Sequence, residues 1–140
     1  MSFKRVKGAD RGNRELNITT EALAVGEALV YVPGSDKVTA ATSSAEIDLS
    51  AGIVVKAATN TDTQVLAQMI MEGDEYIVAT SYDTSTDDNY NTMALTNSTT
   101  VNNSGTTVAD DTGVVRQLGI VGATTDRLVR VEFVRVSHAD

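Results

Sequence analysis

The sequence predicts an all-β fold. Thr, Val, Ser and Gly are abundant, and β-branched residues favour strands over helices. Apolar residues occur in short runs or in alternation with polar ones, and Gly-, Asp- and Ser-rich turns separate these runs. Sustained helical periodicity is hard to find, and ITTEALAVG is the weak candidate for a helix. We therefore expect strands along the chain, with helix only in short pieces.

The first expected hairpin is GEALVYVPGSDKVTAAT, residues 26–42. Its first strand covers Leu29 to Val32, which are rich in strand-forming residues. Pro33 and Gly34 suit the two central positions of a type II turn, because proline fixes a negative φ and glycine accepts a positive one. A second strand follows the turn.

Four further strands are expected in chain order, in AGIVVKA (51–57), TQVLAQMIM (63–71), DEYIVAT (74–80) and GVVRQLGIVGA (113–123). The last is DRLVRVEFVRV (126–136). There Val129, Val131 and Phe133 share one face, and Arg130 and Glu132 share the other. This alternation is typical of a strand with one buried face.

A weak internal repeat divides residues 22–136 into halves at about 22–71 and 72–136. Gly26-Glu27 before ALVYV matches Gly73-Asp74 before EYIVA, VTAAT matches TMALT, and AGIVV matches LGIVG. The wider glycine spacing of the second half indicates a polar insertion of about twenty residues drawn from 83–112, a surface loop or protruding hairpin. Two such units would pack as one barrel or sandwich. Chance similarity between β patterns is the alternative.

The formal charge of −8 is unevenly distributed. Residues 21–113 are strongly acidic, and an acidic body repels phosphate backbones, so we expect no nucleic-acid partner. Residues 1–20 are instead a basic segment, expected as an extended N-terminal arm before a single β domain over 21–140. An acidic protein surface is its favoured target, and a solvated tail is the alternative. The basic residues of this arm are Lys4, Arg5, Lys7, Arg11 and Arg14.

No apolar run approaches the length needed to cross a bilayer, so no membrane association is expected. The first residues lack the apolar core of a secretion signal, which favours cytosol-like conditions. The chain has no Cys and a single His, His138. Cysteine nucleophiles, cysteine-ligated zinc and His-dependent triads are therefore not expected. Glu72, Asp74 and Glu75 alternate across a strand and do not converge.

The acid-rich DTSTDDN at 83–89 invites a calcium interpretation. An EF-hand loop needs Gly at its sixth position and Glu at its twelfth, where this chain has Asp88 and Ala94. A solvated turn is favoured, and the alternative is an irregular cation site held by Asp83, Asp87 and Asp88. We expect no enzyme, with no catalytic residue, metal or cofactor.

Residues 22–136 combine a Gly-acid entry, an apolar strand, a turn and a Gly-Ile-Val strand. The segments are AVGEALVYVPGSDKVTAATSSAEIDLSAGIVV, EGDEYIVATSYDTSTDDNYNTMALTNSTTVNN and VVRQLGIVGATTDRLVRVEFVR. This pattern resembles the small capsid decoration, or cement, proteins of tailed bacteriophages. The resemblance implies a small β-barrel or β-tulip-like domain that stabilises the expanded shell without chemistry. Such proteins commonly assemble as trimers, less often as dimers. A jelly-roll sandwich is the alternative architecture.

The resemblance implies a structural virion protein on the capsid exterior, made in the host cytoplasm. Its partners would be the major capsid protein, contacted by the basic arm, and further copies of itself, contacted through Tyr82 and Tyr90. The alternatives are another virion component, such as a head-fibre base or tail protein, and a carbohydrate- or ligand-binding β-module. Aromatic residues are only 4% of the chain, which argues against the ligand-binding module.

Overall fold

The computed structural model describes residues 2–8, 12–42, 50–104 and 113–134, and this part of the chain is all-β, as predicted. Two short 3₁₀ turns, η2 (Thr86–Asp88) and η3 (Thr124–Asp126), are its helical pieces. ITTEALAVG forms a strand end, an isolated bridge and a turn. The strands are β1 (Lys4–Lys7), β2 (Asn13–Ile18), β3 (Ala28–Tyr31), β4 (Lys37–Ala40), β5 (Ser50–Lys56), β6 (Gln64–Met69), β7 (Glu75–Thr80), β8 (Thr92–Met93), β9 (Leu95–Asn97), β10 (Thr100–Val101), β11 (Val115–Val121) and β12 (Leu128–Phe133).

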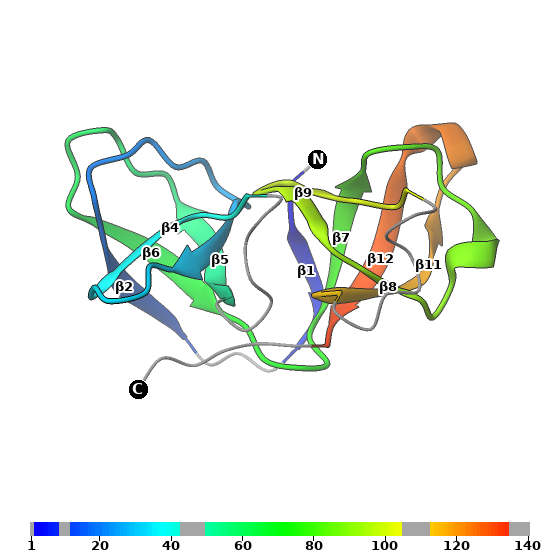
Figure 1. The fold of residues 1–140 in the computed structure, drawn as a ribbon, viewed down its shortest axis with the longest axis horizontal. Coiled ribbons are helices and arrows are strands. Elements are labelled where there is room, and N and C mark those ends of the chain that lie inside the picture. The colour runs from blue at the N-terminus through cyan, green and yellow to red at the C-terminus, as the bar shows by residue number, and fades with distance from the viewer. Residues whose placement is uncertain (1, 9–11, 43–49, 105–112, 135–140) are drawn as a thin grey trace.

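The first sheet is a closed barrel with the strand order β2-β4-β3-β5-β6, on the left of Figure 1. Neighbouring strands in this barrel are antiparallel, except for the parallel pair β2–β4. The β3–β4 turn places Gly34 at a φ of 75°, as a type II turn requires. The side chains that fill the barrel are apolar and aliphatic: Ile18, Leu23, Leu29, Val38, Ala51, Val54, Ala58, Val65 and Ala67.

The second sheet follows the order β8-β11-β12-β7-β10-β9, and β1 also pairs with β7. Its two end strands, β8 and β9, are separated on the chain by Ala94 alone, so the sheet curls into a nearly closed barrel. Val129, Val131 and Phe133 of β12 point into it and are buried, as their alternation predicts.

The two barrels repeat one topology. Each contains one parallel pair, β2–β4 in the first and β10–β7 in the second, and the remaining pairs of the ring are antiparallel in both. Hence β2, β3, β4, β5 and β6 correspond to β7, β8–β9, β10, β11 and β12. Asn17 pairs with both β4 and β6, and Ala79 with both β10 and β12, which makes these two residues equivalent.

The bounds of the repeat differ from those expected from the sequence. They run from Asn13 to Met69 and from Glu75 to Phe133, instead of 22–71 and 72–136. VTAAT belongs to β4, whose counterpart is β10, whereas TMALT contains β8 and the start of β9. The repeat begins one strand earlier than the sequence pattern indicates, because β2 lies inside the expected arm. The two spans are nearly equal in length, so the repeat needs no twenty-residue insertion in 83–112.

Residues of the expected arm are extended, but they form strands of both barrels. β1 pairs with β7 of the second barrel, and β2 belongs to the first. Phe3 is only 4% exposed and packs against the rings of Tyr76 and Phe133, with centroids 6.0 and 5.6 Å away. The N-terminal segment therefore ties the two barrels together (Figure 1).

One continuous apolar core joins the barrels. Val30 and Ile53 of the first barrel belong to the same buried cluster as Val78 and Val101 of the second. Polar contacts reinforce this junction. The amide of Ala28 donates to the carbonyl of Ser98 at 2.7 Å, and the Ser98 hydroxyl donates to the Glu27 carboxylate at 2.6 Å. The two barrels are thus packed side by side.

Candidate interaction surfaces

The basic residues of β1 have different environments. The Arg5 guanidinium donates to the Asp74 carboxylate and to the Met69 carbonyl, both at 2.8 Å, and lies over the Tyr76 ring at 5.5 Å. Arg5 is therefore held inside the fold. Lys4 and Lys7 are exposed, with the Lys7 ammonium 3.5 Å from the Glu75 carboxylate.

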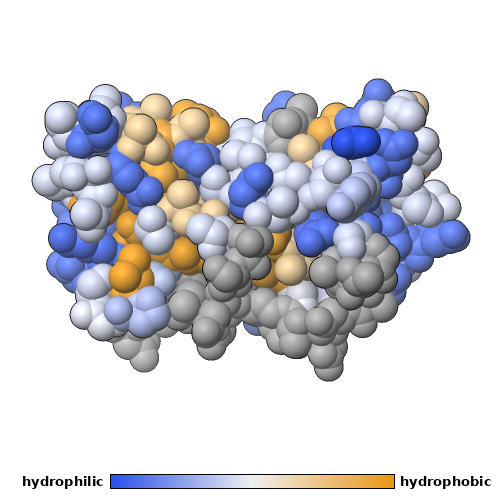
Figure 2. All heavy atoms as spheres, turned by 45° about the horizontal axis from the view of Figure 1, so that its top comes forward, coloured by the Kyte–Doolittle hydropathy of each residue, from blue (hydrophilic) through white to orange (hydrophobic). Residues whose placement is uncertain are grey.

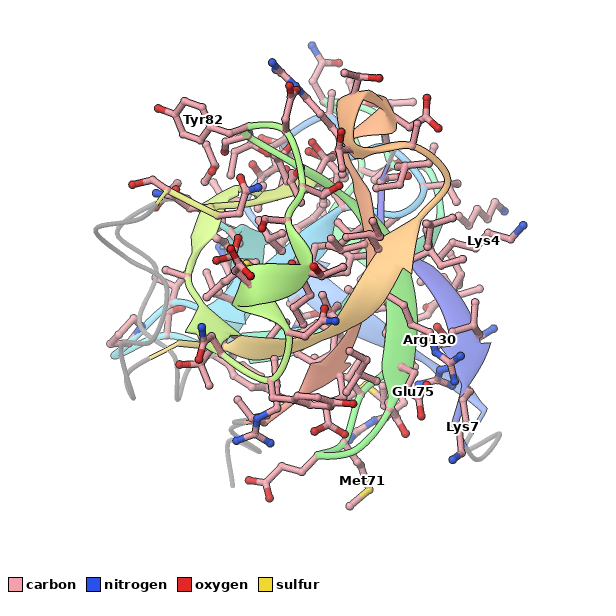
Figure 3. The ribbon with its side chains drawn as sticks, turned by 90° about the vertical axis from the view of Figure 1, so that its right-hand side faces the viewer. Lys4, Lys7, Met71, Glu75, Tyr82 and Arg130 are labelled. Atoms are coloured by element: carbon pink, nitrogen blue, oxygen red, sulfur yellow. The ribbon has the colours of Figure 1, made fainter. Side chains whose placement is uncertain are left out.

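Glu75 is the buried centre of a small ion network. Its side chain is 9% exposed and accepts a hydrogen bond from Arg130 Nε at 2.6 Å, while Lys7 approaches its other oxygen. Figure 3 shows Lys4, Lys7, Glu75 and Arg130 on one side of the second barrel. One buried carboxylate thus lies beneath several exposed cations. Asp74 and Glu75 pair with arginines, consistent with the expectation that this acid cluster does not converge.

Among the described strands, part of one edge of β2 in the first barrel has no partner. Ile18 donates its amide to Thr63 on the β6 side, so alternation directs the amides of Asn13 and Glu15 to the opposite side. On the side away from β6, β4 pairs only with Asn17 and Ile18. On that same side, no strand within the described ranges pairs with Asn13–Leu16, whose only described partner is β6. In the second barrel β1 covers the equivalent edge, at Glu75 to Ile77.

An apolar groove crosses the outer face of the second barrel. Its lining comes from three neighbouring regions: β1, β7 with β12, and the second half of β11. The hollow measures about 410 Å³, and its lining residues are Val6, Ile77, Leu118, Gly119, Ile120, Val121 and Arg130. Val6 is 44% exposed, so apolar surface at the mouth of the groove is open to solvent.

The first barrel carries exposed apolar residues of its own. Val25 and Val32 are both exposed, and a shallow hollow beside Val25 is lined by Leu23, Ala24 and Ala58 among others. On the face of the molecule drawn in Figure 2, apolar residues gather over the first barrel, whereas the surface over the second barrel is mainly polar. Contiguous exposed apolar surface is typical of protein contact sites.

Tyr90 is held in a fixed position on the loop that closes the second barrel. Its amide donates to the carbonyl of Gln117 at 2.7 Å. The Gln117 side chain is fully buried and donates to the carbonyl of Ser85 at 2.8 Å and to Asn89 Oδ1 at 2.9 Å. This clamp keeps Tyr90 at a φ of 69°, with 72% of the residue exposed. Tyr82 is also exposed, at the other end of the loop.

The acids of the same loop do not gather as metal ligands. Asp83 pairs with Arg127 at 2.9 Å, which opposes cation binding there. The part of the chain that the structure describes contains no group of three or more His, Asp or Glu residues suited to a metal ion. Burial raises the pKa of Asp88, and the neighbouring Asp87 raises it further.

The structure places the residues predicted for contacts in several regions. Lys4 and Lys7 lie together on β1, Arg14 is exposed on β2, and Arg5 faces inward. Tyr82 and Tyr90 are exposed at the two ends of the 82–90 loop. Arg11 and His138 lie outside the described residues.

Comparison with known proteins assigns no family: no family model and no curated protein matches this chain. Among the described residues, no helix has both the length and the apolar character that crossing a membrane requires.

Proposed function

We propose that the protein is a structural virion component, a decoration or cement protein that binds the outer surface of a phage capsid and stabilises the expanded shell. The resemblance of residues 22–136 to such proteins supports this function. The structural observation that carries the proposal is the open edge of β2, which has the geometry of a strand acceptor.

The acceptor interpretation follows from the repeat within the chain. In the second barrel the edge of β7, the counterpart of β2, is covered by β1, which is not one of the strands that form that barrel. In the first barrel no strand within the described ranges covers the equivalent backbone groups of Asn13 and Glu15. An extended segment of a partner adds to such an edge through main-chain hydrogen bonds. The partner proposed here is a strand of the major capsid protein.

A neighbouring side chain suits the same contact. Arg14 is exposed on the acceptor strand and favours an acidic capsid surface. Each main-chain hydrogen bond contributes about 1 kcal/mol net, so one short strand gives modest affinity. Occupation of many identical sites on a shell makes modest contacts effective.

Co-sedimentation with expanded, undecorated capsids tests the proposal. Deleting residues 1–15 would remove β1 and half of β2, so a point variant is needed. Glu15→Pro removes the amide that faces the open edge and leaves the amides that face β6 in place. Glu15→Thr is the matched control, because it removes the same carboxylate and keeps the amide.

The wild type should bind saturably at a fixed ratio to the capsid protein. Glu15→Pro should weaken binding about fivefold, the loss expected from about 1 kcal/mol for one main-chain hydrogen bond, and Glu15→Thr should bind like the wild type. Equal binding by Glu15→Pro would keep the decoration role and move the contact away from β2. Absence of wild-type binding at any salt concentration would exclude the capsid role.

A further inference from the structure

The groove on the second barrel is built to receive a side chain. Its floor contains Gly119, and a Cβ atom placed there would meet no atom within 4 Å. Ile77 and Leu118 contribute apolar wall, and neither is fully buried. A large apolar group entering the groove would therefore remove surface from water on several strands at once.

The rim of the groove is basic although the whole chain carries a charge of −8. Lys4 and Lys7 flank Val6 on β1, and Arg130 forms part of the wall. Glu75 neutralises part of this charge from below, where its side chain is largely shielded from solvent. An apolar floor with a cationic rim is complementary to an apolar or aromatic side chain flanked by carboxylates.

The same chain carries a segment of that chemistry. Tyr90 projects from the loop Tyr82–Asn91, which also holds the exposed Asp87 and the half-buried Asp88. Aromatic side chains in the centre of a contact commonly contribute most of its binding energy.

The loop is already organised for binding. Gln117 fixes the loop from inside, and Tyr90 adopts a left-handed conformation that costs energy for a residue other than glycine. A side chain held this way loses little further freedom on association. Figure 3 shows Tyr82, at one end of the loop, and the basic residues Lys4, Lys7 and Arg130 on opposite sides of the view.

We propose that the Tyr82–Asn91 loop of one copy docks in the groove of a second copy, with Tyr90 over Gly119 and Asp87 and Asp88 facing the Lys4–Lys7 rim. The contact is either reciprocal, with each loop in the partner's groove, or head to tail, in which case it closes into a ring or continues as a chain of copies. This inference stands apart from the capsid proposal, since the purified protein alone tests it.

Analytical ultracentrifugation of the purified protein over a concentration series tests the contact. Tyr90→Gly removes the ring and also removes the left-handed strain, so it should fold at least as well as the wild type. Gly119→Gln fills the groove from a position with open space above it. Val25→Ser is the control, an exposed apolar residue of the first barrel. Thermal unfolding checks that every variant is folded.

The wild type should associate with increasing concentration, and less strongly as salt increases. Tyr90→Gly and Gly119→Gln should each sediment as monomers, while Val25→Ser behaves like the wild type. A mixture of the two monomeric variants retains one intact loop and one intact groove, so it should form pairs that grow no further.

Three results would overturn the inference. The first is a wild type that remains monomeric up to about 1 mM, the weak end of the affinity scale. The second is unchanged association in Tyr90→Gly or Gly119→Gln. The third is a mixture that forms no pairs.

Discussion

Phe3 anchors the start of the chain in the shared core. It packs between Tyr76 and Phe133, whose own rings meet edge to face with centroids 5.4 Å apart. Truncation to alanine leaves a cavity at the junction of β1, β7 and β12. Phe3→Ala should therefore lower the free energy of unfolding by about 3 kcal/mol or more, measured by urea denaturation.

A conservative change provides the control for Phe3. Phe3→Leu keeps most of the apolar volume, so it should lower the free energy of unfolding clearly less than Phe3→Ala does. Equal stability of Phe3→Ala and the wild type would show that the N-terminal residues do not occupy the core in solution.

Asp88 gives the loop a defined response to pH. Burial and then the nearby Asp87 raise its pKa above 3.8, so the folded protein holds this proton more tightly than the unfolded chain does. The contribution of the Asp88 proton to the free energy of unfolding is therefore fully present below pH 3.8 and is lost as the pH rises through the folded pKa of Asp88. As the pH rises through that window, Asp88→Asn should become increasingly stable relative to the wild type, because it does not lose a proton.

Urea unfolding of both proteins at several pH values checks the Asp88 prediction. Asp62→Asn is a suitable control, because Asp62 is an exposed acid on a turn of the first barrel. A stability difference between Asp88→Asn and wild type that stays constant with pH would contradict the assigned cause.

At the scale of elements, β1 protects the edge of β7. It pairs with Glu75, Tyr76 and Ile77, and its removal would expose their backbone groups together with the apolar floor of the groove. Deletion of residues 1–8 should lower Tm by roughly 10 °C or more, since Phe3 and a strand ladder are lost together. The exposed edge should also promote aggregation, detectable by light scattering. A soluble variant with unchanged Tm would contradict this role for β1.

The strands that bury apolar side chains could be predicted from the sequence. DEYIVAT contains β7 and TQVLAQMIM contains β6. Both strands could be predicted because the alternation of apolar and polar residues and the β-branched residues reflect burial directly. β1 and β2 could not be found this way. KRVK and NRELNI are mostly polar, and β1 is ordered by Phe3, just before the strand, and by the ion pair between Arg5 and Asp74.

Of the candidate surfaces, the sequence indicated the exposed tyrosines and the basic character of residues 1–20. The sequence does contain a signal for the groove. DEYIVAT is apolar on both faces, with Tyr76 and Val78 inside and Ile77 outside, which indicates a strand whose outer face also needs cover. The open edge of β2 had no such signal, because an unpaired edge depends on where other strands lie in space.

At the scale of the whole molecule, the shared core should make the two barrels unfold together. Val101 lies in the second barrel but belongs to the buried cluster that contains Val30 and Ile53 of the first. Val101→Ala should cost about 2 kcal/mol. If unfolding is cooperative, that loss lowers the stability of both barrels equally.

Amide hydrogen exchange measured by NMR distinguishes cooperative from independent unfolding. In Val101→Ala, protection of the Val54 amide in the first barrel and the Val129 amide in the second should fall by the same factor, about 30-fold for 2 kcal/mol. Independent barrels would lose protection at Val129 alone. Joint loss would mean that β1, the Glu27–Ser98 contact and the common core make the tandem barrels one rigid body. A rigid body of this kind would hold the β2 edge and the groove at a fixed separation, as the two proposed contacts, with a shell and with a neighbouring copy, would require.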